Sequence, residues 1–162
     1  MEKYHIQGFK SSTVYIGCFY NESMVGVMSF LKTNKNTDEW ELTRFATDYH
    51  YLCCGIGGKL FNYFIKNYNP EEVKSFADRR WTSVIDTTLY TRLGFQVDKI
   101  LPPDYYYTSN KGDLIHKFNF RKQRMNKKYG YDLSLTESEM AHMTGYYKIY
   151  NCGLVRYVWR KS

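Results

Sequence analysis

Apolar residues recur at every second position near the start of the chain. Val14, Ile16 and Cys18 follow this spacing, and a second run rich in strand-forming residues spans 23–31. Alternation of this kind is typical of half-buried strands. The pattern therefore predicts a hairpin of two strands, 13–19 and 23–31, joined by the turn 20–22.

Strands and helices alternate in the middle of the chain. A polar loop at 32–39 precedes a predicted strand at 40–47, and a glycine-rich turn at 55–59 precedes a predicted helix at 60–67. Pro70 follows this helix closely and ends it. The next expected elements are a strand at 72–77, a short helix at 87–93 and, after the helix stop at Gly94, a strand from Gln96.

The last third of the chain is expected to complete the same sheet. Thr136 and Glu139 have the spacing of a capping box, which predicts a helix to about Met143. The order of elements and the length of 162 residues predict a single α/β domain over residues 1–162, with a core at 1–110 and a C-terminal part at 111–162. The other features expected here are a tyrosine run at 105–108 after Pro102-Pro103, a hairpin turn at 110–113 into a strand at 114–120, and strands at 146–150 and 154–159 around a hairpin tip at 151–153.

The most distinctive local feature is the turn Gly55-Ile56-Gly57-Gly58-Lys59, between a predicted strand and a predicted helix. The first N–H groups of a helix have no intrahelical partner, and glycine lets an anion approach them closely because no Cβ intervenes. The turn therefore fits a pyrophosphate-binding site. A tight turn that packs the helix against the strand is the other interpretation.

The order of elements and two short motifs resemble the GNAT superfamily of acyl-CoA-dependent N-acyltransferases. Leu52-Cys53-Cys54-Gly55-Ile56-Gly57 is similar to the family's pyrophosphate motif Gln/Arg-x-x-Gly-x-Gly/Ala, with Leu52 at the Gln/Arg position. Leu89-Tyr90-Thr91-Arg92-Leu93-Gly94-Phe95 is similar to the end of a later family helix. The resemblance implies a mixed, mostly antiparallel sheet flanked by helices, and acetyl-CoA or another acyl-CoA as cofactor. The residues it assigns to the cofactor are Ala46, Thr47, Gly55, Ile56, Gly57, Gly58 and Lys59.

The full sequence pattern resembles one branch of the superfamily more than it resembles GNAT enzymes in general. Residues 15–20, 24–30, 40–45 and 75–78 look like strands of phage Mom proteins, which are GNAT-like enzymes that modify the exocyclic amine of adenine in phage DNA. The same block, with the tail from Arg121 to Gly153, also resembles a region attached to phage homing endonucleases of the Hef-like type. That resemblance includes no nuclease domain, so cleavage is not implied.

Excess positive charge is confined to the last third of the sequence. Residues 1–110 hold twelve Lys or Arg and twelve Asp or Glu, whereas residues 111–162 hold eleven and four, which accounts for the net charge of +7. Cations are densest at 117–128, where they are interleaved with Phe118 and Phe120. Cations and flat rings together fit a DNA partner, although a solvated strand edge and helix face would use the same residue types. The candidate DNA contacts are Lys117, Arg121, Lys122 and Arg124.

Candidate catalytic residues fall near the expected cleft. N-acyl transfer needs a group that removes a proton from the attacking nitrogen, a donor for the developing oxyanion and an acid for the leaving thiolate. By the resemblance, Tyr90 matches the tyrosine acid, and packing of its helix is the other role open to it. Glu41 and Arg44 have an odd spacing on one strand, which predicts opposite faces. Because an unpaired buried carboxylate is costly, Glu41 is expected either at the cleft, as a base or substrate ligand, or in a salt bridge.

The segment Asp78-Arg79-Arg80-Trp81 follows the next predicted strand at its C-terminal end, where open α/β sheets bind ligands. Asp78 is a candidate catalytic residue that would hydrogen-bond a base amine, and Arg79 and Arg80 would hold phosphate. Trp81 would stack on a base. Arg44 is counted with them as a substrate contact, and a solvated loop is the other interpretation of the segment.

Several classes of site are not expected. The four cysteines and four histidines are scattered without a metal-ligand spacing, which predicts reduced, mostly structural cysteines and no metal. No run of about eighteen apolar residues occurs, and the first five residues lack the apolar core of a signal peptide. We therefore expect a soluble protein without a membrane partner, and the resemblance implies the cytoplasm of an infected bacterial host.

Three functions stay open at this stage. The leading hypothesis is a phage-type acyltransferase that modifies an adenine-like nucleobase amine in DNA, for which the base must be extruded from the duplex or single-stranded. The second is a non-catalytic nucleic-acid-binding module of the same fold, which Leu52 favours because it replaces the family's Gln or Arg. The third is a protein or small-molecule N-acetyltransferase, including one directed against host defence.

Overall fold

A computed structural model describes residues 5, 7–83 and 87–161. It divides the chain into two compact units, one formed by Met1–Leu101 with Leu154–Ser162 and the other by Pro102–Gly153. We call the first the main unit and the second the inserted unit. These boundaries differ from the division after residue 110 that the charge predicts. Residues 1–4, on which the expectation of no signal peptide rests, lie outside the described part.

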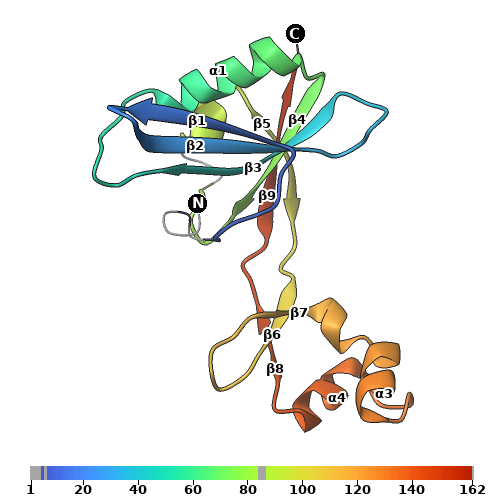
Figure 1. The fold of residues 1–162 in the computed structure, drawn as a ribbon. Coiled ribbons are helices and arrows are strands. Elements are labelled where there is room, and N and C mark those ends of the chain that lie inside the picture. The colour runs from blue at the N-terminus through green and yellow to red at the C-terminus, as the bar shows by residue number, and fades with distance from the viewer. Residues whose placement is uncertain (1–4, 6, 84–86, 162) are drawn as a thin grey trace. The chain divides into compact units, whose positions relative to one another are not determined.

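The main unit is built on a six-stranded sheet with the strand order β1-β2-β3-β4-β9-β5. Neighbouring strands are antiparallel except β3 and β4, which are parallel. This arrangement confirms the expected mixed, mostly antiparallel sheet. The elements are β1 (Val14–Tyr20), β2 (Ser23–Lys32), β3 (Glu39–Thr47), α1 (Ile56–Tyr68), β4 (Glu72–Asp78), α2 (Leu89–Arg92), β5 (Gln96–Leu101) and β9 (Leu154–Arg160) (Figure 1).

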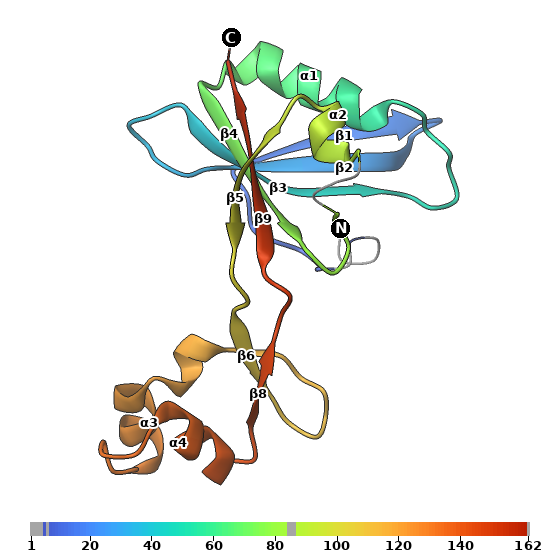
Figure 2. The same ribbon diagram turned by 180° about the vertical axis from the view of Figure 1, so that it is seen from behind.

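Helix α1 supplies much of the core of the main unit. Its buried residues are spaced so that they form one stripe along the helix, and this stripe packs against the sheet. The rings of Phe30 on β2 and Phe64 on α1 stack with centroids 3.6 Å apart, and Trp40 of β3 meets Phe64 edge to face at 5.2 Å. The aromatic residues therefore fix how α1 lies on β2 and β3 (Figures 1 and 2).

The inserted unit has its own three-stranded sheet, in the order β7-β6-β8. Its core consists of Tyr107, Phe120, Met125, Met140 and Ala141, all buried. Its elements are β6 (Tyr105–Thr108), β7 (Ile115–His116), the 3-10 helix η1 (Lys117–Phe120), α3 (Lys122–Tyr129), α4 (Glu137–Met143) and β8 (Tyr147–Tyr150) (Figure 2). The capping box at Thr136 and Glu139 is confirmed as the start of α4.

Two expectations for the last third are wrong, and one helix was not expected. The strand at 114–120 ends at His116, because the His116 ring accepts the Phe118 N–H and starts a 3-10 turn instead. The expected hairpin around 151–153 does not form, since β8 pairs with β6 whereas β9 pairs with β4 and β5. Residues 122–129 form helix α3, which the alternation of cations and rings did not indicate.

The return of β9 to the main unit also divides the basic last third. Arg156 on β9 pairs with Asp98 on β5, and Arg160 pairs with Glu72 on β4 at 2.8 Å. The inserted unit keeps eight Lys or Arg and five Asp or Glu. Part of the charge that is crowded in the sequence is therefore neutralised within the main sheet.

Replacing Phe64 by Ala should lower the free energy of unfolding of the main unit by about 3–5 kcal/mol, because it removes a fully buried ring that contacts Phe30 and Trp40. Urea denaturation followed by tryptophan fluorescence measures this, since all three tryptophans belong to the main unit. Tyr63→Ala, at an exposed position of the same helix, is the control. Equal destabilisation by both changes would contradict the assigned core.

Candidate active site

Strands β3 and β4 separate soon after they meet. Their parallel pairing is limited to Glu39–Glu41 of β3 and Glu72–Lys74 of β4, although β3 continues to Thr47 and β4 to Asp78. At the point of separation the buried Ser75 hydroxyl donates to the Leu42 carbonyl at 2.9 Å. A side chain thus replaces the next rung of the ladder, and the strands diverge beyond it.

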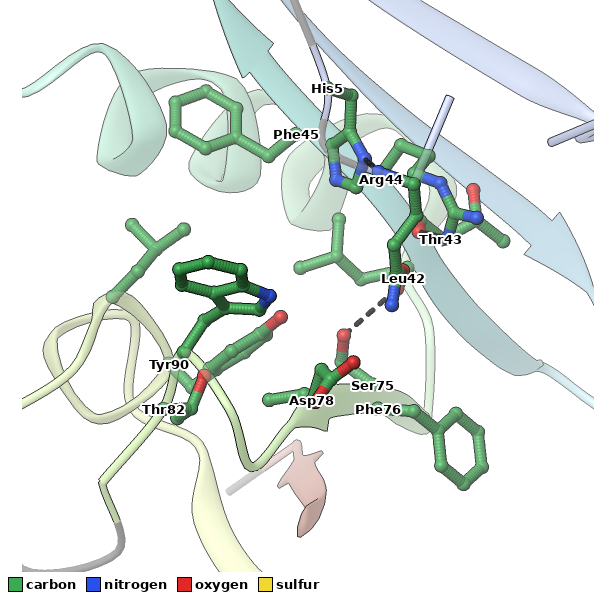
Figure 3. A pocket seen from close by; sticks show the side chains of 14 residues that line it. His5, Leu42, Thr43, Arg44, Phe45, Ser75, Phe76, Asp78, Thr82 and Tyr90 are labelled. Atoms are coloured by element: carbon green, nitrogen blue, oxygen red, sulfur yellow. Dashed lines mark hydrogen bonds between the residues drawn. The ribbon is translucent and has the colours of Figure 1, made fainter. Parts of the chain in front are cut away.

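A cavity of about 270 Å³ occupies the space between the diverging strands. Residues from β3, β4, α2 and the N-terminal segment line it, and Figure 3 shows their side chains around one hollow. The lining residues are His5, Gln7, Leu42, Thr43, Arg44, Phe45, Ser75, Phe76, Ala77, Asp78, Trp81, Thr82, Leu89 and Tyr90. The sequence-predicted residues Arg44, Asp78, Trp81 and Tyr90 are therefore brought together.

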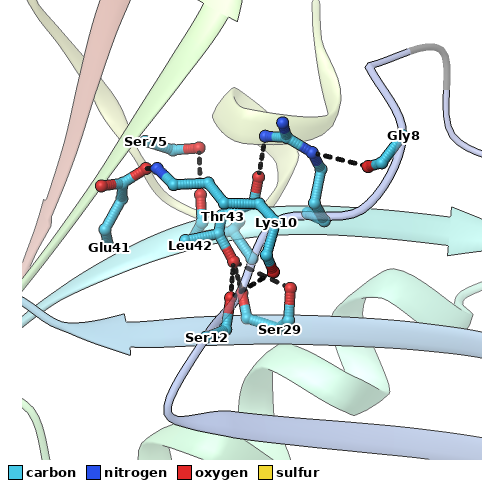
Figure 4. Close-up of polar contacts among 9 residues, drawn as sticks. Gly8, Lys10, Ser12, Ser29, Glu41, Leu42, Thr43 and Ser75 are labelled. Carbon is cyan, nitrogen blue, oxygen red and sulfur yellow. Dashed lines mark hydrogen bonds and ion pairs between the residues drawn. The ribbon is translucent and has the colours of Figure 1, made fainter. Parts of the chain in front are cut away.

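A bulge in β3 changes which side chains share a face. The register with β2 shifts between Ser29, which faces Arg44, and Phe30, which faces Leu42, so Thr43 is the extra residue. Glu41 binds Lys10 and Arg44 binds the Gly8 carbonyl, so both meet the same N-terminal segment (Figure 4). The prediction that Glu41 and Arg44 lie on opposite faces is wrong, because an extra residue shifts the alternation by one.

Glu41 lies outside the cavity lining. Its carboxylate is 2.6 Å from the Lys10 ammonium, which is the salt-bridged alternative that the sequence left open. Thr43 anchors the same region, since its hydroxyl donates to the Ser29 carbonyl at 3.0 Å and lies 2.7 Å from the Ser12 hydroxyl. These contacts fasten the N-terminal segment to β3 beside the cavity (Figure 4).

Arg44 brings a half-buried guanidinium to the cavity. It donates from Nε to the Gly8 carbonyl at 3.1 Å and from Nη1 to the Thr43 carbonyl at 2.7 Å. Burial lowers the pKa of Arg44 from its usual value, and the nearby Glu41 carboxylate partly offsets this. A guanidinium has five N–H donors, so three of them have no hydrogen-bond acceptor within the described residues. Arg44 can therefore bind an acceptor group that enters the cavity.

Tyr90 stands on α2 at the edge of the same cavity. Its ring stacks on Tyr157 of β9 with centroids 4.6 Å apart and an interplanar angle of 14°. Burial raises the pKa of the Tyr90 phenol, while hydrogen bonding with Ser75 and the Arg44 cation act in the opposite direction. The phenol thus keeps its proton at neutral pH. Tyr90 therefore packs against the sheet, as one of its two expected roles requires, and also lines the cavity, where the expected tyrosine acid would have to lie.

Asp78 is held by its neighbour Arg80. The guanidinium donates to both carboxylate oxygens, with the shortest contact 2.6 Å from Nη2, and the Arg80 N–H donates to Oδ1 at 2.9 Å. These contacts hold the pKa of Asp78 below its usual value. Asp78 is therefore an ionised ligand for a donor rather than a strong base. Arg79 is exposed outside the cavity lining, whereas Trp81 lines it with 66% of its surface exposed.

The glycine turn opens α1 as expected. Gly55 caps the helix with φ of 75°, a conformation that side chains disfavour. The amides of Gly57 and Gly58 make no hydrogen bond within the described part of the chain, since the neighbouring turn uses Ile56 N and Lys59 N. A Cβ on Gly57 would lie 3.1 Å from Leu89, a cavity residue, whereas one on Gly58 would meet nothing within 4 Å. The turn therefore adjoins the cavity and presents open amides.

Ala46 and Thr47 lie on a strand edge left free by the separation. They pair with Val27 and Gly26 of β2 on one side, and β4 does not reach them on the other. Lys59 is exposed on the first turn of α1. The residues assigned to a cofactor by the resemblance thus lie along β3 and the helix start that follows it.

The cavity residues that the sequence reasoning missed include His5, Gln7 and Ser75. Burial and the nearby Arg44 cation lower the pKa of His5, and its Nδ1 accepts the Gln7 N–H at 3.1 Å. No motif marked His5 or Gln7, because their place in the cavity depends on contact with β3, which is far from them in the sequence. Ser75 carried a signal, since a polar residue inside a buried strand needs a partner.

The four candidate DNA contacts of the basic segment all belong to the inserted unit. Lys117 is tied to both carboxylate oxygens of Asp104, at 2.6 and 2.7 Å. The Arg121 guanidinium lies 4.0 Å over the Phe118 ring, and Lys122 donates to the Leu133 carbonyl at 3.1 Å. Arg124 is exposed on α3. Of the aromatics interleaved with them, Phe118 is exposed and Phe120 is buried in the core of the unit.

Other classes of site were searched in the residues that the structure describes. These contain no group of three or more His, Cys, Asp or Glu side chains arranged to hold a metal ion. None of the helices in this part is long and apolar enough to span a bilayer.

No family model and no curated protein matches the sequence. Solved structures do match the fold. A Bacillus subtilis acetyltransferase in complex with CoA aligns with a TM-score of 0.52 and 16% identity, over 91% of this chain and 76% of that one. A GNAT family acetyltransferase from Elizabethkingia anophelis with acetyl-CoA bound gives 0.52 and 14%, over 91% and 75%. The ribosomal-protein-S18-alanine N-acetyltransferase from Escherichia coli gives 0.51 and 15%, over 92% and 69%. The chain therefore has the GNAT fold.

Replacing Arg80 by Gln should lower the free energy of unfolding by about 1–2 kcal/mol at pH 7, because the buried Asp78 carboxylate loses a charged donor. The pair holds the pKa of Asp78 down, so its stabilisation is present above the ordinary Asp pKa of about 3.9 and is lost as the pH falls through the lower folded-state pKa. Urea denaturation across this pH range should show the deficit shrinking on acidification. Arg79→Gln is the exposed control, and a deficit independent of pH would contradict the assignment.

Proposed function

We propose that this chain is an acyl-CoA-dependent N-acyltransferase whose acceptor is a nucleobase amine, adenine-like, in DNA. The observation that carries the transferase assignment is the separation of β3 from β4, with the cavity and Tyr90 in the gap and the glycine turn after β3. Solved structures with the same fold, two of them with CoA or acetyl-CoA bound, support it.

The residues along β3 and α1 fit an acyl-CoA. The edge of β3 that faces the gap is not paired with β4 beyond Glu41, so its main chain at Ala46 and Thr47 is open to the amide groups of a pantetheine arm. Within the residues that the structure describes, the amides of Gly57 and Gly58 at the helix start have no hydrogen-bond partner, and no Cβ fills the space in front of Gly58. A helix start of this kind binds phosphate oxygens. When bound, the cofactor supplies an acyl group activated as a thioester.

Tyr90 then acts as a proton donor to the leaving sulfur. Its raised pKa keeps the phenol protonated at neutral pH, which a general acid requires. The N–H groups of β3 that point into the gap are not used by β4, and they provide fixed donors for the developing oxyanion. Both parts of this chemistry belong to the walls of the same cavity.

The carboxylates at and beside the cavity are each bound by a cation, which favours an acceptor that needs no strong base. Among the described lining residues Asp78 is the carboxylate, and Arg80 lowers its pKa; Glu41 binds Lys10 outside the lining. An alkyl ammonium group, with a pKa of about 10.4 in lysine, must lose a proton before it attacks. The exocyclic amine of a nucleobase is already neutral at pH 7. Asp78 can accept a hydrogen bond from such an amine. As the C–N bond forms and the nitrogen becomes acidic, the Asp78 carboxylate takes the proton that the nitrogen loses, while Tyr90 gives its own proton to the departing sulfur.

The other polar and aromatic residues of the lining also suit a nucleotide. Trp81 offers an exposed indole at the cavity for stacking on a base. The three N–H donors of Arg44 that have no acceptor among the described residues match the oxygens of a phosphate or the acceptor atoms of a base. The sequence resemblance to phage Mom-like proteins points the same way, and it stays a prediction, as does the expected location in an infected bacterium.

A non-catalytic nucleic-acid-binding module is the second candidate. Leu52, at the position of the family's Gln or Arg, is 96% exposed and offers no hydrogen bond to a phosphate. This observation favours weak cofactor binding. Transfer to a protein or a small molecule is the third, and the products of the first experiment below separate it from transfer to a base.

The change Tyr90→Phe should lower kcat by about 100-fold without raising KM for the acyl-CoA, because it removes the proton donor and keeps the ring that stacks on Tyr157. Mass spectrometry of nucleosides from cells that express the chain should reveal a new, Tyr90-dependent base mass. Tyr63→Phe, on the exposed side of α1, is the control. Acetylated protein or small amines without a modified base would support the third candidate, and no transfer at all would support the second.

The change Gly58→Asp should weaken CoA binding about tenfold, because it adds a negative charge beside the proposed phosphate site. The substitution has free space and places an acid in the first helical turn, where it does not destabilise the helix. Isothermal titration with CoA measures the effect. Asn62→Asp, exposed further along α1, adds the same charge as a control, and equal affinities in the two variants would contradict the proposed phosphate site.

A further inference from the structure

The inserted unit carries a row of exposed side chains across its sheet, which we call the ring row: Ile149, Tyr106, His116, Phe118 and Arg121. Tyr106 on β6 is directly opposite His116 on β7 and Ile149 on β8. The ring centroids of Tyr106 and His116 are 5.7 Å apart, and those of His116 and Phe118 are 4.6 Å apart. The Arg121 guanidinium ends the row 4.0 Å from the Phe118 ring centre.

The ring row lies on the face of the sheet that does not build the core. Side chains alternate along β6, so Tyr107 is fully buried whereas Tyr106 is 36% exposed. Phe118 and Ile149 are 50% and 45% exposed. Burying these groups against water-free surface would be favourable, yet the unit leaves them open while it buries Tyr107 and Phe120. Contacts within the row hold the rings in place before any ligand arrives, which lowers the entropy cost of binding.

The charge around the row suits an anionic partner. Arg121 leads directly into α3, which adds Lys122, Arg124, Lys127 and Lys128, and none of these five cations is in an ion pair with a described residue. Four of the five acids of the unit have partners within it. Asp104 binds Lys117, Asp113 binds Ser109, Asp132 binds the Ser134 N–H and Glu139 caps α4. The cations of 121–128 are thus free to face a phosphate backbone.

We propose that the ring row binds the bases of a single-stranded nucleic acid, with Arg121 and α3 contacting its phosphates. Open rings on a sheet can stack only on bases that are not already stacked within a duplex. A guanidinium lying over a ring adds a second flat cationic surface of the kind on which bases stack. This inference extends the proposed function without depending on it, because the surface belongs to the inserted unit and binding needs no acyl donor.

Fluorescence anisotropy of the full chain with labelled oligonucleotides tests the proposal. The probes are an oligo-dT strand of about 15 nucleotides, its oligo-rU counterpart and a duplex of equal length. The proposal expects tighter binding of both single strands than of the duplex, and comparable binding of DNA and RNA indicates that stacking rather than the sugar governs affinity. Phe118→Ala and His116→Ala should each weaken binding of the single strands about 5- to 100-fold.

Two further variants make the test specific. Tyr150→Ala removes a ring that is even more exposed, at 63%, from the opposite face of the same sheet, so it should leave affinity unchanged. Arg121→Gln should reduce the slope of log affinity against log salt by about 0.7, the value for one phosphate contact on a single strand. Tyr63→Phe, at an exposed position of α1 in the main unit, should bind like the unchanged chain, and all binding is measured without an acyl donor, so a loss of acyl transfer does not mimic a loss of binding.

The outcomes separate the possible occupants. Equal weakening by Phe118→Ala and Tyr150→Ala, preference for the duplex, or no binding of either single strand would overturn the proposal. So would a chain that dimerises through the row, which sedimentation would reveal as a dimer that Phe118→Ala dissociates without an effect on the oligonucleotides. Circular dichroism of each variant excludes unfolding as the cause of a loss.

Discussion

The site depends on a single structural constraint, the short parallel contact between β3 and β4. Every other neighbouring pair in the main sheet is antiparallel, and this one ends after three residue pairs. The Ser75 hydroxyl donates to the Leu42 carbonyl where the ladder stops, so this carbonyl keeps a hydrogen bond although the strands separate. Had the pairing continued, main chain would fill the cavity, and Arg44 and Tyr90 would not meet there.

The bulge at Thr43 adds to the effect of the separation of β3 from β4. It turns the side chain of Arg44 to the same side as Glu41, and the N-terminal segment then closes over both through Lys10 and Gly8. The segment thereby contributes His5 and Gln7 to the cavity lining. One extra residue in a strand thus decides which charges lie beside the gap and which are neutralised outside it.

The sequence predicted those features of the fold that depend on interactions between residues close together in the chain. The hairpin turn, the glycine start of α1 and the capping box of α4 follow from residues within a few positions of one another, and the structure has all three. The bulge, the ion pair of Glu41 and the roles of His5 and Gln7 depend on contacts between distant segments, which no spacing encodes. The inserted unit was missed for the same reason, because alternating residues at 146–150 and 154–159 fit a hairpin equally well until their partners are known.

The way the inserted unit joins the main sheet has an evolutionary consequence. The chain leaves β5 at Leu101 and re-enters β9 at Leu154, and these two residues are direct partners in an antiparallel pair. The whole of 102–153 therefore replaces what a tight two-strand connection could do on its own. Because Leu101 and Leu154 already pair, a change in the length or sequence of 102–153 need not alter the register of the main sheet, so the two units are free to change separately.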